Sequence, residues 1–236
     1  HNRKIDFSKM DYDDPKVFEL LSSGNTLGVF QLESAGMRVF MKQLKPDNFE
    51  DIVAGISLYR PGPMDSIPTY IENKTNPQNV TYLHEKLKPI MEVTYGCLVY
   101  QEQVMQVVRE LGGYTYGRSD LVRRAMGKKK MDVMEEERRY FVYGKEDENG
   151  NIEIAGCIRN GVPEDIANKI FDDMIDFAKY AFNKSHAAAY GVLSYQTAYL
   201  KAYYPVEFMA ALITSVMGNT DKVVEYIREC NALGIE

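Results

Sequence analysis

A cluster of cationic side chains is the part of this sequence best suited to chemistry. Six basic residues and one acid lie between Arg118 and Lys130, a local charge of +5 in a chain whose net charge is −6. Arg124 and Lys128 are four residues apart, so they would project from one side of a continuing helix. A guanidinium group matches two phosphate oxygens at once, and an ammonium group adds a mobile charge. The spacing therefore indicates a site for a triphosphate or for a nucleic-acid backbone.

The same cluster also has a purely structural interpretation. Acidic residues follow it at Asp132 and at 135–137, so the cations could form a solvated face that is neutralised within the chain. Composition alone leaves both interpretations open.

Arg60 is a second candidate for binding an anion. It directly precedes Pro61-Gly62-Pro63, a rigid turn that would end the preceding helix and fix the base of the arginine side chain. Rigid placement suits anion recognition. The structural alternative is an arginine that caps the carbonyl groups of the helix.

A third polar segment lies at the expected start of a long helix. Ser185 could cap this helix, which would place Asn183 and Lys184 at an N-terminus that favours anions. His186 and Tyr190 are four residues apart and would share one helix face. A lone histidine is more often structural than catalytic, and the sequence leaves this choice open.

A fourth segment, 100–105, opens another expected helix with polar residues. Glu102 and Gln103 could cap the helix, or they could reach a substrate. Capping or core roles are the interpretation that the pattern favours.

Several common catalytic patterns are absent from the sequence. It contains no G-x-x-x-x-G-K-[ST] phosphate loop and no G-x-G-x-x-G motif. Cys97, Cys157 and Cys230 are scattered, which argues for a reducing compartment and against both a disulfide framework and a zinc site. The sequence has no apolar run long enough to cross a membrane.

The elements that must position these residues are mainly helical. Apolar residues recur at three- and four-residue intervals, which predicts helices at about 15–23, 37–44, 49–56, 104–111, 166–177, 185–204, 206–217 and 220–233. Short strands are expected at 27–32 and 96–100. A small hairpin near 140–158 would join 140–143 to 152–154 through the Asn149-Gly150 turn. No linker divides the chain, so we expect a single, mainly α domain over 1–236.

Seven segments occur in the order in which one protein family has them. In this order they resemble the fingers region of the bacterial DNA polymerase III alpha subunit family, the C-family replicative DNA polymerases. The resemblance extends from about residue 13 to the C-terminus, whereas residues 140–158 depart from the family pattern and receive no function. The segments are 29–34, 58–63, 95–105, 123–129, 182–190, 195–197 and 204–211.

The resemblance implies that the chain is a fragment of an enzyme of DNA replication. The parent would extend a primer by nucleotidyl transfer with two Mg²⁺ ions, held by palm-domain aspartates that precede this chain. Residues 1–30 would then form the connection from the palm. The fragment alone is expected to bind no metal and to be inactive. Its expected partners are DNA primer–template, dNTP and, through other parts of the parent, replisome subunits, in the cytoplasm and without a membrane.

The resemblance also implies roles for individual residues. Fingers close over the incoming nucleotide, so Arg123 and Arg124 first, and Arg60 and Lys128 next, are expected to bind its triphosphate. Four further residues are expected to contact phosphate or the DNA backbone without reading sequence. These are Lys129, Lys130, Lys184 and His186.

Two alternatives belong to other functional classes. A non-catalytic helical module that binds nucleic acid or protein would pair Arg123 and Arg124 with the chain's own acids and would contain no phosphate site. A free-standing phosphoryl-transfer enzyme is disfavoured, because the sequence shows neither a phosphate loop nor a pair of metal-binding carboxylates.

Overall fold

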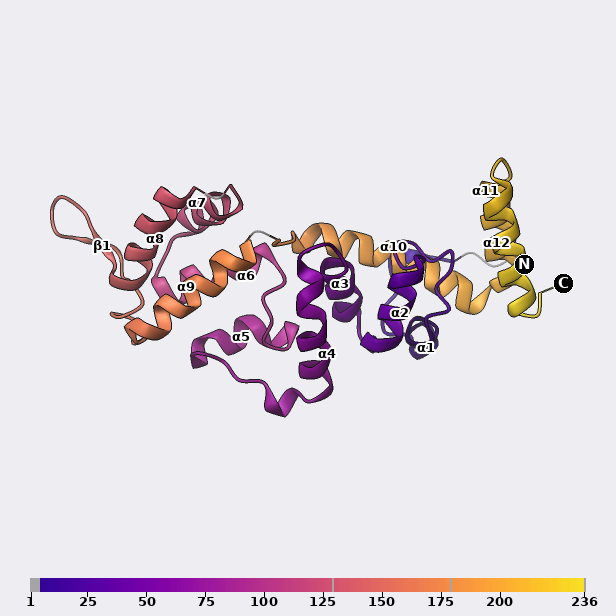
Figure 1. Ribbon diagram of the computed structural model, residues 1–236, viewed down its shortest axis with the longest axis horizontal. Helices are drawn as coiled ribbons and strands as arrows, with labels where there is room; N and C mark the ends of the chain where they lie inside the picture. The colour runs from indigo at the N-terminus through magenta and orange to yellow at the C-terminus, as the bar shows by residue number, and fades with distance from the viewer. Residues whose placement is uncertain (1–4, 129, 179, 236) are drawn as a thin grey trace. The chain divides into compact units, whose positions relative to one another are not determined.

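The computed structural model describes residues 5–128, 130–178 and 180–235. Over these residues the chain is mainly helical with one small antiparallel sheet, which confirms the expected fold class (Figure 1). Contacts divide the chain into two compact units. The first combines the chain up to Ile56 with the chain from Ser185 onwards, and the second is Ser57–Lys184. A single domain over 1–236, with 1–30 as a connection, stays a prediction.

The first unit begins with helices whose ends follow from their sequence. The side chain of Asp14 accepts a hydrogen bond from the Lys16 amide, and Gly24 ends the first helix at a φ of +69°. A Cβ at Gly24 would lie 2.6 Å from the carbonyl oxygen of Arg38, so this position excludes other residues. The unit contains η1 (Phe7–Lys9), α1 (Pro15–Ser23), α2 (Ala35–Leu44), most of α3 (Phe49–Leu58), most of α10 (Lys184–Tyr203), α11 (Pro205–Ser215) and α12 (Thr220–Ala232).

A buried lysine joins three segments of the first unit. Lys201 of α10 is only 2% exposed. Its ammonium donates to the carbonyl groups of Asn25 and Leu27, at 2.8 Å each. It also forms an ion pair with Glu229 of α12 at 2.7 Å. Burial lowers the pKa of Lys201, and the bond to Glu229 opposes that shift.

The second unit is built around α6, α7, α8 and α9 (Figure 1). Their inner faces form an apolar core that includes Val108, Leu111, Phe141, Phe171 and Met174. The elements of the unit are η2 (Pro63–Ser66), α4 (Ile67–Thr75), η3 (Pro77–Asn79), η4 (Glu85–Leu87), α5 (Lys88–Met91), η5 (Glu92–Thr94), α6 (Gln101–Gly112), α7 (Tyr116–Gly127), α8 (Met131–Tyr143), β1 (Lys145–Glu146), β2 (Ile152–Ile154) and α9 (Glu164–Ala178).

The hairpin is shorter than the sequence predicts. Residues 140–143 were expected as its first strand, but they form the last turn of α8. Phe141 and Val142 are fully buried in the helical core, and this tertiary contact outweighs their preference for strands. The strands are β1 and β2, with Lys145 opposite Ile154, and they are joined through the predicted turn at Gly150.

The other two expected strands are also wrong. Residues 27–32 form consecutive turns, in which the Val29 amide bonds to the carbonyl of Thr26 and the Leu32 amide bonds to the carbonyl of Val29. Residues 96–100 make a single parallel bridge, between Tyr100 and Phe182. The apolar side chains of both segments are largely buried although neither segment belongs to a sheet.

Gln103 fixes the approach of the chain to α6. The side chain is 3% exposed, and its Oε1 accepts from the amides of Val99 and Tyr100 at 2.8 and 2.9 Å. Its Nε2 donates to the Ile90 carbonyl at 3.2 Å and to Thr94 Oγ1 at 2.7 Å. The capping and core interpretation of Gln103 is therefore confirmed.

Replacing Gln103 by leucine is expected to lower the free energy of unfolding by about 2–4 kcal/mol, because two buried amide N–H groups lose their acceptor. Urea denaturation of the chain measures this loss. Gln106→Leu is the matched control, since Gln106 is an exposed residue of the same helix. Equal unfolding midpoints for the two variants would contradict the prediction.

Candidate functional site

The beginning of α6 and the segment that precedes α10 lie side by side in the second unit. The Gln101 amide donates to the carbonyl of Phe182 at 2.9 Å. The Gln101 side chain donates through Nε2 to the carbonyl of Ala181 at 3.3 Å. These bonds hold residues 181–182 against α6.

Glu102 continues this attachment. One carboxylate oxygen accepts from Asn183 Nδ2 at 2.9 Å, and the other accepts from the amide of Lys184 at 3.0 Å. Because α10 begins at Lys184, Ser185 lies inside the helix and the expectation that it caps the helix is wrong. The carboxylate of Glu102 occupies the place that helix N-termini offer to an anion.

The end of α7 carries the predicted cations. The helix stops at Gly127, one residue before Lys128, whose amide still donates to the carbonyl of Arg124 at 3.1 Å. Arg124 and Lys128 therefore remain one helical turn apart, although the helix does not continue through both.

A hollow of about 200 Å³ lies between these elements. Three of the four residues predicted to bind the nucleotide line it, and Gln101 contributes a polar side chain. The lining residues are Gln101, Val104, Arg123, Arg124, Met126, Gly127, Lys128 and Ala181.

Asp120 binds both arginines of the hollow. Its Oδ1 accepts from Arg123 Nε at 2.9 Å and from Arg123 Nη2 at 2.7 Å. Its Oδ2 forms an ion pair with Arg124, at 2.7 Å from Nε. The hydrogen bond from Arg123, together with the charges of both arginines, lowers the pKa of Asp120. These are the internal ion pairs that the interaction-module alternative expects.

The ion pairs leave positive charge at the hollow. Arg123, Arg124 and Lys128 carry three positive charges against the single negative charge of Asp120. The Arg124 side chain is 61% exposed, and within the described residues its terminal nitrogens form no hydrogen bond. The hollow can therefore hold a multiply charged anion.

Arg60 lies in the same unit but does not line this hollow. Its Nε donates to the carbonyl of Ser57 at 2.9 Å, which confirms the alternative that it caps the preceding helix. Its Nη2 donates to the Tyr180 carbonyl at 3.0 Å, and its guanidinium lies 4.1 Å from the ring centroid of Phe182. Burial lowers the pKa of Arg60. A Cβ at Gly62, where φ is +102°, would overlap the Tyr180 ring.

The remaining candidates are dispersed. Lys129 lies outside the described residues, and Lys130 is an exposed residue just before α8. His186 belongs to the first unit, where its ring centroid lies 4.3 Å from that of Tyr190, which confirms that they share a helix face. The ammonium of Lys184 lies 5.2 Å from the ring centroid of Tyr100.

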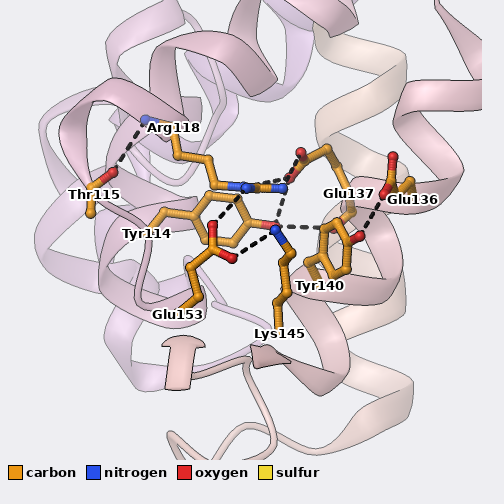
Figure 2. Close-up of polar contacts among 8 residues, drawn as sticks. All are labelled: Tyr114, Thr115, Arg118, Glu136, Glu137, Tyr140, Lys145 and Glu153. Atoms are coloured by element: carbon orange, nitrogen blue, oxygen red, sulfur yellow. Dashed lines mark hydrogen bonds and ion pairs between the residues drawn. The ribbon is translucent and has the colours of Figure 1, made fainter. Parts of the chain in front are cut away.

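A polar network around Glu137 holds α7 against α8 and the hairpin (Figure 2). Arg118 Nη2 donates to Glu137 Oε1 at 2.8 Å, and Tyr114 donates its hydroxyl to Glu137 Oε2 at 3.0 Å. Arg118 Nη1 also donates to Glu153 at 3.2 Å, and Glu153 pairs with Lys145. Arg118 is therefore bound inside the unit and adds no charge to the hollow.

Sequence reasoning missed Asp120 and Gln101. Asp120 precedes the two arginines by three and four residues, and this helical spacing is a signal that could have found it. No local signal marks Gln101, because its contact with residue 181 depends on the tertiary fold.

Residues 5–128, 130–178 and 180–235 show neither a membrane-spanning helix nor a metal-binding cluster. No helix there is long and apolar enough to span a membrane. No group of three or more histidine, cysteine, aspartate or glutamate side chains there is placed to bind a metal ion.

The sequence is similar to parts of longer known proteins. A family model described as "Bacterial DNA polymerase III alpha subunit finger domain" matches residues 1–149. DNA polymerase III subunit alpha of Thermus aquaticus is 52% identical, over 98% of this chain and 18% of that protein. The proteins of the same name from Bacillus subtilis and Rickettsia felis are each 48% identical, over 99% of this chain and 20% and 18% of theirs. The chain thus spans about a fifth of the length of these relatives.

Proposed function

Because this chain belongs to the family of bacterial DNA polymerase III alpha subunit finger domains, we propose that it binds the triphosphate of the incoming dNTP during DNA chain elongation. The observation that carries the proposal is the hollow in which Arg123, Arg124 and Lys128 converge with an excess of positive charge. The relatives that match almost the whole chain are named as DNA polymerase subunits, which supports a nucleotide as the anion.

The three cations have different tasks in this proposal. Arg124 presents its terminal nitrogens to phosphate oxygens, and Lys128 adds a mobile positive charge. Arg123 is held by Asp120 and Gln101 and contributes charge from a fixed position. Together they orient the triphosphate and offset the negative charge that develops as pyrophosphate leaves. Contact between Arg60 and the triphosphate stays a prediction.

Within the described residues, no three histidine, cysteine, aspartate or glutamate side chains lie together as metal ligands. We place the two Mg²⁺ ions of the parent polymerase on residues outside this chain. In this proposal the chain supplies binding and orientation, and by itself it does not catalyse nucleotidyl transfer.

Primer–template DNA is the proposed second partner. Lys129, Lys130, Lys184 and His186 would contact phosphates without reading the sequence. The carboxylate of Glu102 lies next to Lys184 and reduces the positive charge there. Replisome subunits would bind other parts of the parent protein, and the cytoplasm is its proposed location.

Primer extension by the full-length polymerase tests the triphosphate site. Arg124→Ala is expected to lower kcat/KM for dNTP by on the order of tenfold, because each lost 1.4 kcal/mol of transition-state binding is worth that factor. Arg228→Ala is the control, since Arg228 is an exposed arginine of α12 that makes no ion pair within the described residues. Unchanged dNTP kinetics in a folded Arg124→Ala enzyme would refute the proposal.

A non-catalytic interaction module remains the second candidate, because both arginines pair with Asp120 as that alternative expects. In this case Arg124→Ala would leave the dNTP kinetics unchanged and would weaken binding of a protein or nucleic-acid partner. Measuring DNA affinity beside dNTP kinetics separates the two candidates.

A further inference from the structure

We propose that Asp120 is a positioning residue of the triphosphate site, which binds Arg123 through Nε and Nη2 and Arg124 through Nε, and so leaves the terminal nitrogens of Arg124 for the substrate. The inference rests on the proposed function. It assigns a task to an acidic residue that would otherwise be taken for one half of a surface ion pair.

The geometry divides one carboxylate between two guanidinium groups. Oδ1 of Asp120 accepts from Arg123 through Nε and Nη2, and Oδ2 forms an ion pair with Arg124 Nε at 2.7 Å. Because the three residues are spaced i, i+3 and i+4 on α7, the helix itself sets this arrangement.

The two arginines are bound to different extents. Arg123 also donates through Nη1 to Gln101 Oε1 at 2.9 Å, so each of its three nitrogens has an acceptor. Gln101 is oriented in turn by its bond to the carbonyl of Ala181. Arg124 pairs with Asp120 through Nε, and its side chain lines the hollow. Its Nη1 and Nη2 groups form no hydrogen bond within the described residues. Arg124 is therefore the residue that contacts phosphate, and Arg123 is a fixed neighbouring charge.

Asp120 also reduces the electrostatic repulsion between the two arginines. Adjacent guanidinium groups repel each other, and long side chains lose rotamer entropy when a ligand orders them. A carboxylate between them lowers the repulsion and orders both before the substrate arrives. The remaining charges of the hollow still sum to a cationic site for a triphosphate.

Steady-state primer extension by the full-length polymerase tests the inference, with dNTP concentration varied. Asp120→Ala is expected to raise KM for dNTP or lower kcat by on the order of tenfold, because the arginines lose their orientation. Asp120→Asn keeps an acceptor oxygen and is expected to restore part of this loss. Glu135→Ala is the matched control, since Glu135 is an exposed acid of α8 outside the hollow.

A triple variant separates positioning from a general structural effect. If Asp120 acts through the arginines, Asp120→Ala has little further effect on kcat/KM in an Arg123→Ala/Arg124→Ala background. A full additional loss in that background would overturn the inference. So would a lower KM in Asp120→Ala, because Asp120 would then be a competitor of the phosphates.

The arginine variants keep the two proposals distinguishable. If they leave dNTP kinetics unchanged, the triphosphate site itself is refuted. If they impair dNTP kinetics while folded Asp120→Ala and Asp120→Asn enzymes match the wild type, only the positioning role is refuted.

Discussion

Replacing Glu229 by leucine is expected to lower the free energy of unfolding of the first unit by about 3–5 kcal/mol, because it leaves a buried charge without its counterion. The Lys201 side chain is 1% exposed, and its ammonium would keep only the carbonyls of Asn25 and Leu27 as acceptors. Neutral carbonyl oxygens do not replace the carboxylate. Urea denaturation of the chain at constant pH measures the loss.

Glu225→Leu is the matched control for this experiment. Glu225 lies on the same helix and pairs with Lys222, but both side chains are about 40% exposed. Exposed pairs contribute little, so this change is expected to cost less than about 1 kcal/mol. Equal losses in the free energy of unfolding for Glu229→Leu and Glu225→Leu would show that burial of Lys201 does not increase the cost of losing its counterion.

The pH dependence of the Glu229→Leu variant supplies a second readout. Burial already lowers the pKa of Lys201 in the wild type, and without Glu229 the pKa falls further. The folded variant then binds fewer protons than its unfolded state between the lowered pKa and the ordinary lysine pKa. Its deficit in the free energy of unfolding relative to the wild type should therefore shrink as the pH rises from the Lys201 pKa of the variant to that of the wild type.

Glu137→Leu is the second change with a large expected effect, about 3–5 kcal/mol in the free energy of unfolding. The carboxylate of Glu137 binds Arg118 and the buried hydroxyl of Tyr114 at the same time (Figure 2). Burial, followed by the charge of Glu137, raises the pKa of Tyr114, so this hydroxyl stays a donor that needs an acceptor. Its bond to the backbone carbonyl of residue 137 would remain.

The neighbouring Glu136 provides the control for Glu137. Its exposed carboxylate accepts from the Tyr140 hydroxyl on the surface of α8 (Figure 2). Glu136→Leu is expected to cost less than about 1 kcal/mol. Thermal and urea unfolding measure the stability of both variants. Equal losses for Glu136→Leu and Glu137→Leu would contradict the prediction.

The helices of the first unit were largely predictable because their signals are local. Asp14 and Pro15 begin α1 and Gly24 ends it, as the sequence indicates. The short α4 and α5 were not predicted, since neither presents a repeated apolar face. The last turn of α8 was mistaken for a strand, because burial of Phe141 in a helical core is a tertiary effect.

The charged residues of the candidate site were predictable from the sequence, but their hydrogen-bond partners were not. Arg123, Arg124 and Lys128 are close in sequence, so a single helix end brings them together. Arg60 was expected beside them, yet the carbonyls of Ser57 and Tyr180 bind it elsewhere in the unit. Its two partners lie 3 and 120 positions away, and local patterns report only the nearer one.

The bond between Arg60 and Tyr180 has a topological consequence. The second unit begins at Ser57 and ends at Lys184. In the sequence it is therefore an insertion between the two segments of the first unit. This hydrogen bond joins residues that are 120 positions apart and that lie near the two ends of the inserted segment. Neighbouring termini are the property that allows domain insertion and circular permutation. The ends of residues 57–184 thus lie near each other within the second unit, where Arg60 binds the carbonyl of Tyr180.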